Sequence, residues 1–517
     1  MKLAAQFIAK FTNFITASLS CFDRVIFKGH LRLLSYSKGL EYFVDHTLGI
    51  RRKDFMAWAK GQSQRIIDHA RHLAEQANCP FVYLNRPVRK DDLVQGFLRS
   101  QPVDQGLVCV LRCLEHCPSF RLTIGDRRPR FTPARPKCLV FYFYYLDPDL
   151  GLIHVRLPTL FPFAIQVAVN GHNYLARQMH RAGLQFVQQD NVFTELQDPA
   201  RAQRLADHFE RENWPRRLRQ LARRVLPLMG DVLRPYAYYW VVDQAEYATD
   251  LIFTNRAALA SLYPHLLDYA VLHFAAKDIL TFLGRRLHPL FDGEILTECR
   301  KDRAPGARIK HRVGKNWLKM YDKLALVLRI ETVINDPRLF RVRRRRQRKG
   351  QCKMVWCPMN KGVVNLYRYR QVALAANARY LDALSVVEPT RPVQAPLHRL
   401  AEPRRVRGRC FAGFNPARPK DLALFQAVLD GDHLLRGLRN VDLRVRLFGL
   451  DPSDPIQHRR RSNAVSRLLK RLHVHRILVK VPHTRRWHLT PPGRRLLTAA
   501  VEAYQRHFPQ ALDRLAA

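Results

Sequence analysis

Residues 459–501 read RRRSNAVSRLLKRLHVHRILVKVPHTRRWHLTPPGRRLLTAAV and carry the clearest fold pattern of the chain. The first half has apolar residues at helical spacing, namely Val465, Leu468, Leu469 and Leu472. Two short β-type segments follow, 477–481 and 487–489, separated by the basic tip 482–486. Thr490 precedes two prolines and is a typical helix N-cap. The pattern predicts a helix, a hairpin and a second helix in that order.

The residues upstream extend this pattern. Residues 421–429 and the segment that follows Asn440 both have apolar residues at helical spacing. Asn440 is expected to cap the second of these helices, and Ser462 is placed to cap the helix that begins the quoted stretch. Three helices followed by a basic hairpin are the order of a winged helix-turn-helix, whose third helix enters the major groove of DNA. The expected contacts with nucleic acid are Arg459, Arg460, Arg461, Arg467, Lys470, Arg471, Arg485 and Arg486.

The charge of the whole chain points to the same kind of partner. Lys and Arg number 88 against 43 Asp and Glu, which gives a formal net charge of +45. Such an excess favours a polyanion, because neutralising phosphates releases counterions. The competing explanation is an arginine-rich proteome. The densest run lies at 341–353, RVRRRRQRKGQCK, where a surface loop or hairpin tip is expected to present Arg343, Arg344, Arg345 and Arg346.

Cysteine usage and hydropathy bear on the compartment. Ten cysteines in 517 residues do not make a disulfide framework, and their spacing with histidine gives no zinc pattern, so no metal ligands are assigned among them. Apolar runs stay shorter than the ~18 residues of a membrane span. The sequence therefore predicts a reduced, cytoplasmic location without a membrane partner.

Composition divides the chain into three parts. Residues 1–387 mix helical and strand patterns and are expected to form an α+β region with antiparallel sheets, with a division into two subdomains at 1–235 and 236–387. Within this region, residues 138–160 are expected to form a β-hairpin. Asn170, His172 and Asn173 stand at the expected start of a helix and are interpreted as capping residues, with ligand binding as the alternative. Residues 388–418 are rich in proline and arginine and are interpreted as a linker. Residues 419–517 then form the winged helix.

Acidic residues of the long N-terminal region are candidates for catalysis. Asp23 lies in an expected strand between apolar residues, and Glu246 and Asp250 share one face if their segment is helical. Asp322 and Glu331 lie on neighbouring expected strands. A nuclease of the RNase H type gathers carboxylates in this way around Mg²⁺ or Mn²⁺. The alternative is that each acid forms a structural ion pair with one of the many arginines.

The stretch 308–336 predicts antiparallel strands with a charged face. Lys319, Tyr321 and Lys323 alternate on one strand, and Arg329 and Glu331 alternate on the next. Such a face suits contact with nucleic acid through Lys319 and Lys323.

The same stretch, KMYDK…LRIE, resembles a segment of rolling-circle replication initiators. The resemblance implies that Tyr321 is the nucleophile that attacks a phosphodiester. The pattern departs from that family upstream, because His154 is followed by Arg156 where the family has a second histidine.

Most of the chain is similar to a family of uncharacterised bacterial proteins of comparable length that end in a winged helix. The matching stretches include SCFDRVIFKG, EYATDLIF, RIKHRVGKNWLKMYDK and LRIETVIND. The resemblance suggests an origin in a mobile element. The leading expectation is a DNA-binding protein. The alternatives are a metal-dependent DNA-processing enzyme (nuclease, replication initiator or transposase-like) and an RNA-binding protein.

Overall fold

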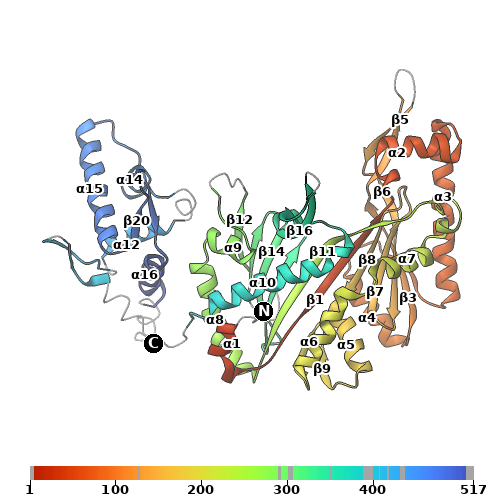
Figure 1. Ribbon diagram of the computed structural model, residues 1–517, viewed down its shortest axis with the longest axis horizontal. Helices are drawn as coiled ribbons and strands as arrows, with labels where there is room; N and C mark the ends of the chain where they lie inside the picture. The colour runs from red at the N-terminus through yellow and green to blue at the C-terminus, as the bar shows by residue number, and fades with distance from the viewer. Residues whose placement is uncertain are drawn as a thin grey trace. The chain divides into compact units, whose positions relative to one another are not determined.

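The computed structural model describes residues 5–124, 129–288, 293–300, 307–348, 351–387, 400–406, 408–415, 418–430 and 437–507 (Figure 1). Helices and strands are mixed around a large, mostly antiparallel sheet, in agreement with the expected α+β class. The chain divides into two compact units, 1–259 with 314–381 and 260–313 with 382–517. This division differs from the expected subdomains, because the sheet of the first unit draws strands from both sides of residue 235.

The first unit is organised by one sheet. Its strands lie in the order β14 (Asn316–Lys323), β15 (Val327–Ile334), β11 (Tyr239–Phe253), β1 (Ile15–His30), β8 (Ile165–Asn170), β7 (Gly151–Pro158), β6 (Lys137–Asp147), β3 (Gly106–His116) and β2 (Phe81–Tyr83). The paired neighbours are antiparallel except for β2 and β3. The hairpin expected at 138–160 is the β6–β7 pair.

The two long central strands, β1 and β11, pair along nearly their whole length. Their β-branched and aromatic residues suit a strand buried on both faces. The register slips between Phe22 and Arg24, so Asp23 is the extra residue of a β-bulge. A bulge turns neighbouring side chains to the same face and is common beside functional sites.

Different elements cover the two faces of these central strands. On one face lies α10 (Leu366–Leu384), whose Asn377 accepts a hydrogen bond of 2.6 Å from Thr332 and donates to the Tyr247 carbonyl at 3.1 Å. On the other face lie α5 (Gly171–Arg181) and the hairpin of β9 (Phe186–Gln189) and β10 (Val192–Leu196). The second face also carries the acidic residues.

The remaining helices and hairpins of the first unit surround the sheet. The helices are α1 (Ala5–Lys10), α2 (Ser37–Tyr42), α3 (Phe55–Gln76), α4 (Lys90–Ser100), α6 (Pro199–Asp207) and α7 (Trp214–Val225). Two hairpins form separate small sheets, β4 (Ser119–Thr123) with β5 (Arg130–Ala134) and β16 (Arg341–Arg348) with β17 (Gln351–Pro358). The basic run that suggested a loop or tip is therefore mostly strand.

The second unit begins with most of α8 (Arg256–His273), followed by α9 (Ala276–Phe282) and the hairpin of β12 (Ile295–Arg300) and β13 (Arg308–Val313). Its C-terminal part contains α12 (Pro419–Leu429), α14 (Asn440–Phe448), α15 (Pro455–Val474), β20 (Leu478–Lys480), β21 (Trp487–Leu489) and α16 (Pro491–Glu502). One apolar core joins these elements, with Phe425, Leu443, Val465 and Leu497 at its centre.

Two expectations about the C-terminal helices are wrong. Ser462 does not begin a helix, because α15 starts at Pro455 and Asp454 is its N-cap, accepting a hydrogen bond from the Ile456 amide at 2.9 Å. Asn440 is the first residue of α14 and not its cap, and its side-chain amide donates to the Ser462 carbonyl. An aspartate before proline is a stronger start signal than a serine inside a helical stretch.

The expected linker is partly folded. Residues 388–399 lie outside the described residues, but β18 (Arg404–Val406) and β19 (Arg409–Phe411) form a hairpin. Leu400 and Phe414, on either side of this hairpin, are buried in the C-terminal core. Part of the segment interpreted as a linker from its proline and arginine content therefore belongs to the C-terminal fold. Among the residues that the structure describes, each helix is too short or too polar to cross a lipid bilayer.

Replacement of Gly171 by alanine is expected to destabilise the first unit. A Cβ at this position would lie 2.0 Å from the Phe22 carbonyl oxygen, which is backbone of β1 beside the bulge. Overpacking of this kind costs about 1–3 kcal/mol. Gly96→Ala in α4 is the matched control, because its Cβ would meet open space and the change removes a helical glycine. Chemical denaturation should show a lower free energy of unfolding for Gly171→Ala and not for Gly96→Ala. Equal stability of the two variants would contradict the packing between Gly171 and Phe22.

Candidate functional site

Three adjacent strands bring the acidic residues together on one face of the sheet. Ala248 of β11 lies opposite Glu331 of β15, and Glu246 lies opposite Arg24 of β1. Alternate residues of a strand share a face, so Glu246 and Asp250 lie on the same face as Glu331. The segment around Glu246 and Asp250 is strand and not helix. Glu246 and Asp250 still share a face, as expected, because side chains alternate along a strand and residues four apart point to the same side.

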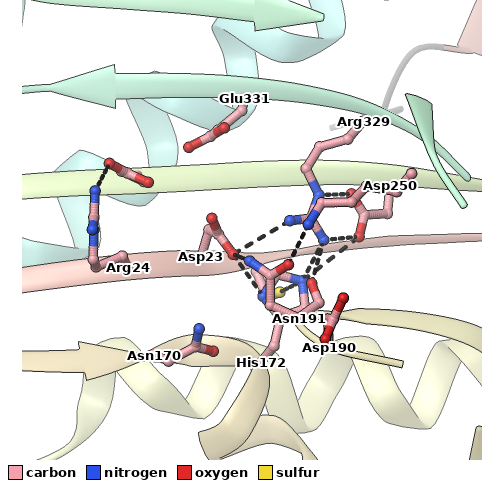
Figure 2. Close-up of polar contacts among 12 residues, drawn as sticks. Asp23, Arg24, Asn170, His172, Asp190, Asn191, Asp250, Arg329 and Glu331 are labelled. Carbon is pink, nitrogen blue, oxygen red and sulfur yellow. Dashed lines mark hydrogen bonds and ion pairs between the residues drawn. The ribbon is translucent and has the colours of Figure 1, made fainter. Parts of the chain in front are cut away.

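Asp23, Glu246 and Glu331 form a buried carboxylate cluster. Figure 2 labels Asp23 and Glu331 of this cluster, together with Arg24, Asp250 and Arg329. One oxygen of each carboxylate lies within 4.8 Å of the others. Asp23 is 7% exposed, Glu246 5% and Glu331 1%. The bulge in β1 is what turns Asp23 towards the other two. These three residues, called the carboxylate cluster below, are the arrangement within the described residues that could hold a divalent metal ion.

The two glutamates of the cluster oppose each other electrostatically. Burial and the nearby Glu331 carboxylate raise the pKa of Glu246 to about 7, although Lys319 and Arg24 act in the other direction. Arg24 donates a hydrogen bond of 2.7 Å to Glu246, but the arginine side chain is half exposed and so compensates only partly.

Lys319 and Tyr321 of β14 hold Glu331. The lysine ammonium lies 3.2 Å from both carboxylate oxygens, and the tyrosine hydroxyl donates a hydrogen bond of 2.7 Å. Burial and Glu331 raise the pKa of Tyr321 well above its usual range, so its phenol keeps the proton. The geometry thus makes Tyr321 a hydrogen-bond donor that orients Glu331. This role differs from the nucleophilic role that was expected for Tyr321.

Asp250 is neutralised by a buried arginine. Arg329 donates to both Asp250 oxygens, at 2.6 and 2.7 Å, and is fully buried. Its third nitrogen lies 3.3 Å from Asp23. Burial raises the pKa values of Asp23 and Asp250, but Arg329, His172 and the other polar groups around these carboxylates together outweigh burial and hold both pKa values below the ordinary range. Asp250 therefore anchors Arg329 and is not a member of the cluster.

His172, in the first turn of α5, lies beneath Asp23. Its Nδ1 atom is 3.1 Å from an Asp23 oxygen, at an angle poor for a hydrogen bond, and its Nε2 atom is 2.9 Å from Arg329. Burial and Arg329 lower the pKa of the His172 ring, but Cys21, Asp23 and Asp250 outweigh them and raise this pKa well above its ordinary value. Asn170 caps α5 as expected, accepting from the Asn173 amide.

The tip of the β9–β10 hairpin covers the cluster. Asn191 donates a hydrogen bond of 2.7 Å to Asp23 and accepts one of 2.5 Å from Lys323, while its carbonyl accepts from Arg329 at 2.7 Å. Asp190 has a positive φ of 52°, a conformation that aspartate tolerates in tight turns. The sequence analysis missed Asn191 and the central place of Arg329.

Asp322 does not join the other acidic residues. It lies opposite Leu328, on the face of the sheet away from Tyr321 and Glu331. Strand alternation alone accounts for this separation, so Asp322 is not a member of the candidate site.

The basic residues expected to contact nucleic acid fall into two groups. Arg461 donates to the carbonyls of Phe448 and Leu450, and Arg471 donates to the carbonyls of Ala412 and Gly413. These two residues hold the C-terminal fold together. The exposed residues are Arg343, Arg345, Arg346, Arg459, Arg460, Arg467, Lys470 and Arg485, whereas Lys319, Lys323, Arg344 and Arg486 are partly exposed.

The sequence matches no known protein-family model, and no curated protein or solved structure is similar to it. The resemblances drawn from the sequence therefore remain predictions, and the chemistry of the site rests on its own geometry.

Glu246 should make the metal-free protein less stable as pH rises. Its folded-state pKa of about 7 lies above the ordinary 4.5, so the native state binds this proton more tightly than the unfolded chain. The resulting stability is complete below pH 4.5 and is lost as pH rises through 7. Each unit of pKa shift is worth about 1.4 kcal/mol, so wild type should lose up to about 3 kcal/mol relative to Glu246→Gln between pH 4.5 and 8 in EDTA. Denaturation curves that stay parallel over this range would contradict the environment assigned to Glu246.

Proposed function

We propose that the protein is a metal-dependent enzyme that binds nucleic acid, with DNA the expected polymer, and cleaves its phosphodiester backbone. The observation that carries this proposal is the carboxylate cluster, in which three buried acids from three neighbouring strands converge. A face that only needed stability would place apolar residues here, because burying three carboxylates costs free energy even when cations lie beside them.

The donor set of the cluster suits Mg²⁺ or Mn²⁺. Both ions take oxygen ligands, and two ligands of one Mg²⁺ ion lie at most about 4.2 Å apart, twice the usual bond length. The separation of the cluster oxygens, within 4.8 Å, is close to this limit. A divalent cation would also relieve the repulsion between Glu246 and Glu331. Bound there, it would supply an activated water molecule and stabilise charge on a phosphoryl oxygen.

The side chains around the cluster have separate tasks in this proposal. Arg24 is half exposed beside Glu246 and is suited to hold a backbone phosphate. Tyr321 and Lys319 fix the orientation of Glu331. Asn191 fixes Asp23 from above.

The C-terminal part supplies the proposed contact with duplex DNA. Its order of three helices, hairpin and helix supports a winged helix-turn-helix, with α15 as the recognition helix and β20–β21 as the wing. The corrected start of α15 places Arg459 and Arg460 inside this helix, where they continue the exposed basic surface of Arg467 and Lys470. Arg485 lies at the wing tip. The net charge of +45 supports a polyanionic partner for both parts.

Nicking of supercoiled plasmid tests the enzymatic proposal. We expect Mn²⁺- or Mg²⁺-dependent nicking that falls at least about 100-fold in Asp23→Asn and in Glu331→Gln, because each change removes a ligand charge. Asp322→Asn is the matched control, since this carboxylate lies on the same strand as Tyr321 but faces away from the cluster. Full activity in both cluster variants, or no nicking of duplex or single-stranded DNA by wild type, would contradict the proposal.

The salt dependence of duplex binding tests the C-terminal interface. Loss of two phosphate contacts in Arg467→Ala/Lys470→Ala should weaken binding and reduce the slope of log K against log salt by about 1.8. Arg89→Ala, a change at an exposed arginine of the first unit, should leave the slope unchanged. An unchanged slope in the double variant would remove α15 from the interface, and equal measurements on duplex RNA would identify the preferred polymer.

A further inference from the structure

The hairpin of β16 and β17 has one face that is exposed along its whole length. Directly opposed residues of an antiparallel pair point to the same face, and here Arg343 lies opposite Trp356 and Arg345 opposite Met354. Trp356 is 60% exposed and Met354 49% exposed. These four residues, called the ribbon face below, place two arginines beside two large apolar side chains in solvent.

The opposite face of the same hairpin is anchored to the first unit. Val342 and Cys357, which pair with each other, are buried. Arg368 of α10 donates a hydrogen bond of 2.9 Å to the Arg343 carbonyl, and the backbone of Met359 bonds to that of Phe340 at the base. The ribbon face is therefore held in place from behind.

The exposed tryptophan has no structural task within the described residues. Its ring contacts no aromatic ring or cation there, whereas Trp214 and Trp240 are both buried. An exposed tryptophan costs solubility and invites association. Its presence beside arginines is therefore best explained by a ligand that covers it.

Charge restricts the chemistry of that ligand. Residues 341–358 contain eight arginines and lysines and no acidic residue. A polyanion that also has flat apolar surfaces satisfies both requirements. In duplex DNA the bases are stacked and paired, so their flat faces are not available to a side chain. An unpaired strand presents both its phosphates and its bases.

We propose that the ribbon face binds single-stranded nucleic acid, with Trp356 stacking on a base and Arg343 and Arg345 contacting the adjacent phosphates. The inference rests on the proposed binding of nucleic acid and narrows its substrate class to molecules with an unpaired segment. The hairpin begins at Arg341, and residues 335–340, which include a 3-10 turn at Pro337–Leu339, connect it to the end of β15, the strand that carries Glu331.

Fluorescence anisotropy of the full chain with three labelled probes tests this inference: a single-stranded DNA 20-mer, its RNA equivalent and the matching DNA duplex. Trp356→Ala should weaken single-strand binding about tenfold and leave both duplex binding and the salt slope unchanged, because stacking is not electrostatic. Trp356→Phe should restore most of the affinity. Arg343→Ala/Arg345→Ala should weaken single-strand binding and lower its salt slope by about 1.4.

Tyr36→Ala is the control for loss of an exposed aromatic residue, and should have no effect on any probe. Single-strand binding that is unchanged in Trp356→Ala, while duplex binding persists, would overturn the inference and leave the proposed function intact. A change in oligomeric state of Trp356→Ala without loss of single-strand affinity would also overturn it, in favour of a contact between copies of the chain. If the wild-type protein bound none of the three probes, the proposed function itself would be rejected. The DNA and RNA arms separate the two sources of an unpaired strand.

Discussion

The repulsion between Glu246 and Glu331, which lie on the same face of the neighbouring strands β11 and β15, is the constraint on which the site depends. The buried carboxylates of the site are compensated to different degrees. Asp250 is neutralised by the bidentate contact with Arg329, which lies opposite it on the neighbouring strand. None of the three cluster carboxylates has a bidentate arginine of this kind: Arg24 beside Glu246 is half exposed, Lys319 contacts Glu331, and Arg329 reaches Asp23 with one nitrogen. An additional cation would therefore be stabilised most strongly at the cluster.

Sequence periodicity determines much of the fold because strands and helices with one buried face repeat at fixed intervals. The alternation in LRIETVI placed Glu331 and Arg329 on the correct face of β15, and Asn170 was correctly interpreted as a helix cap. The spacing of Glu246 and Asp250 was ambiguous, because a separation of four gives a common face in either structure. The wrong start of α15 arose from two competing capping residues in one basic stretch.

Other parts of the site follow only from pairing between distant segments. The bulge at Asp23 is created by the register of β1 against β11, which no local pattern records. Asn191 reaches the cluster because the β9–β10 hairpin folds back over the sheet. The buried Arg329 left a weak signal, a single charge in an apolar strand, but its partners come from four separate segments. The role proposed for Trp356 likewise could not be predicted from the sequence, because it depends on the strand pairing that places Trp356 opposite Arg343.

The central claim is that a divalent cation binds among Asp23, Glu246 and Glu331. Anomalous diffraction from crystals grown with Mn²⁺ at pH 8 measures this directly. The account predicts a strong anomalous peak about 2.2 Å from carboxylate oxygens of all three residues, with Arg24 displaced from Glu246. Clear density for Arg24, Lys319 and the three carboxylates with no anomalous peak among them would contradict it, and the cluster would then be a structural ion-pair network.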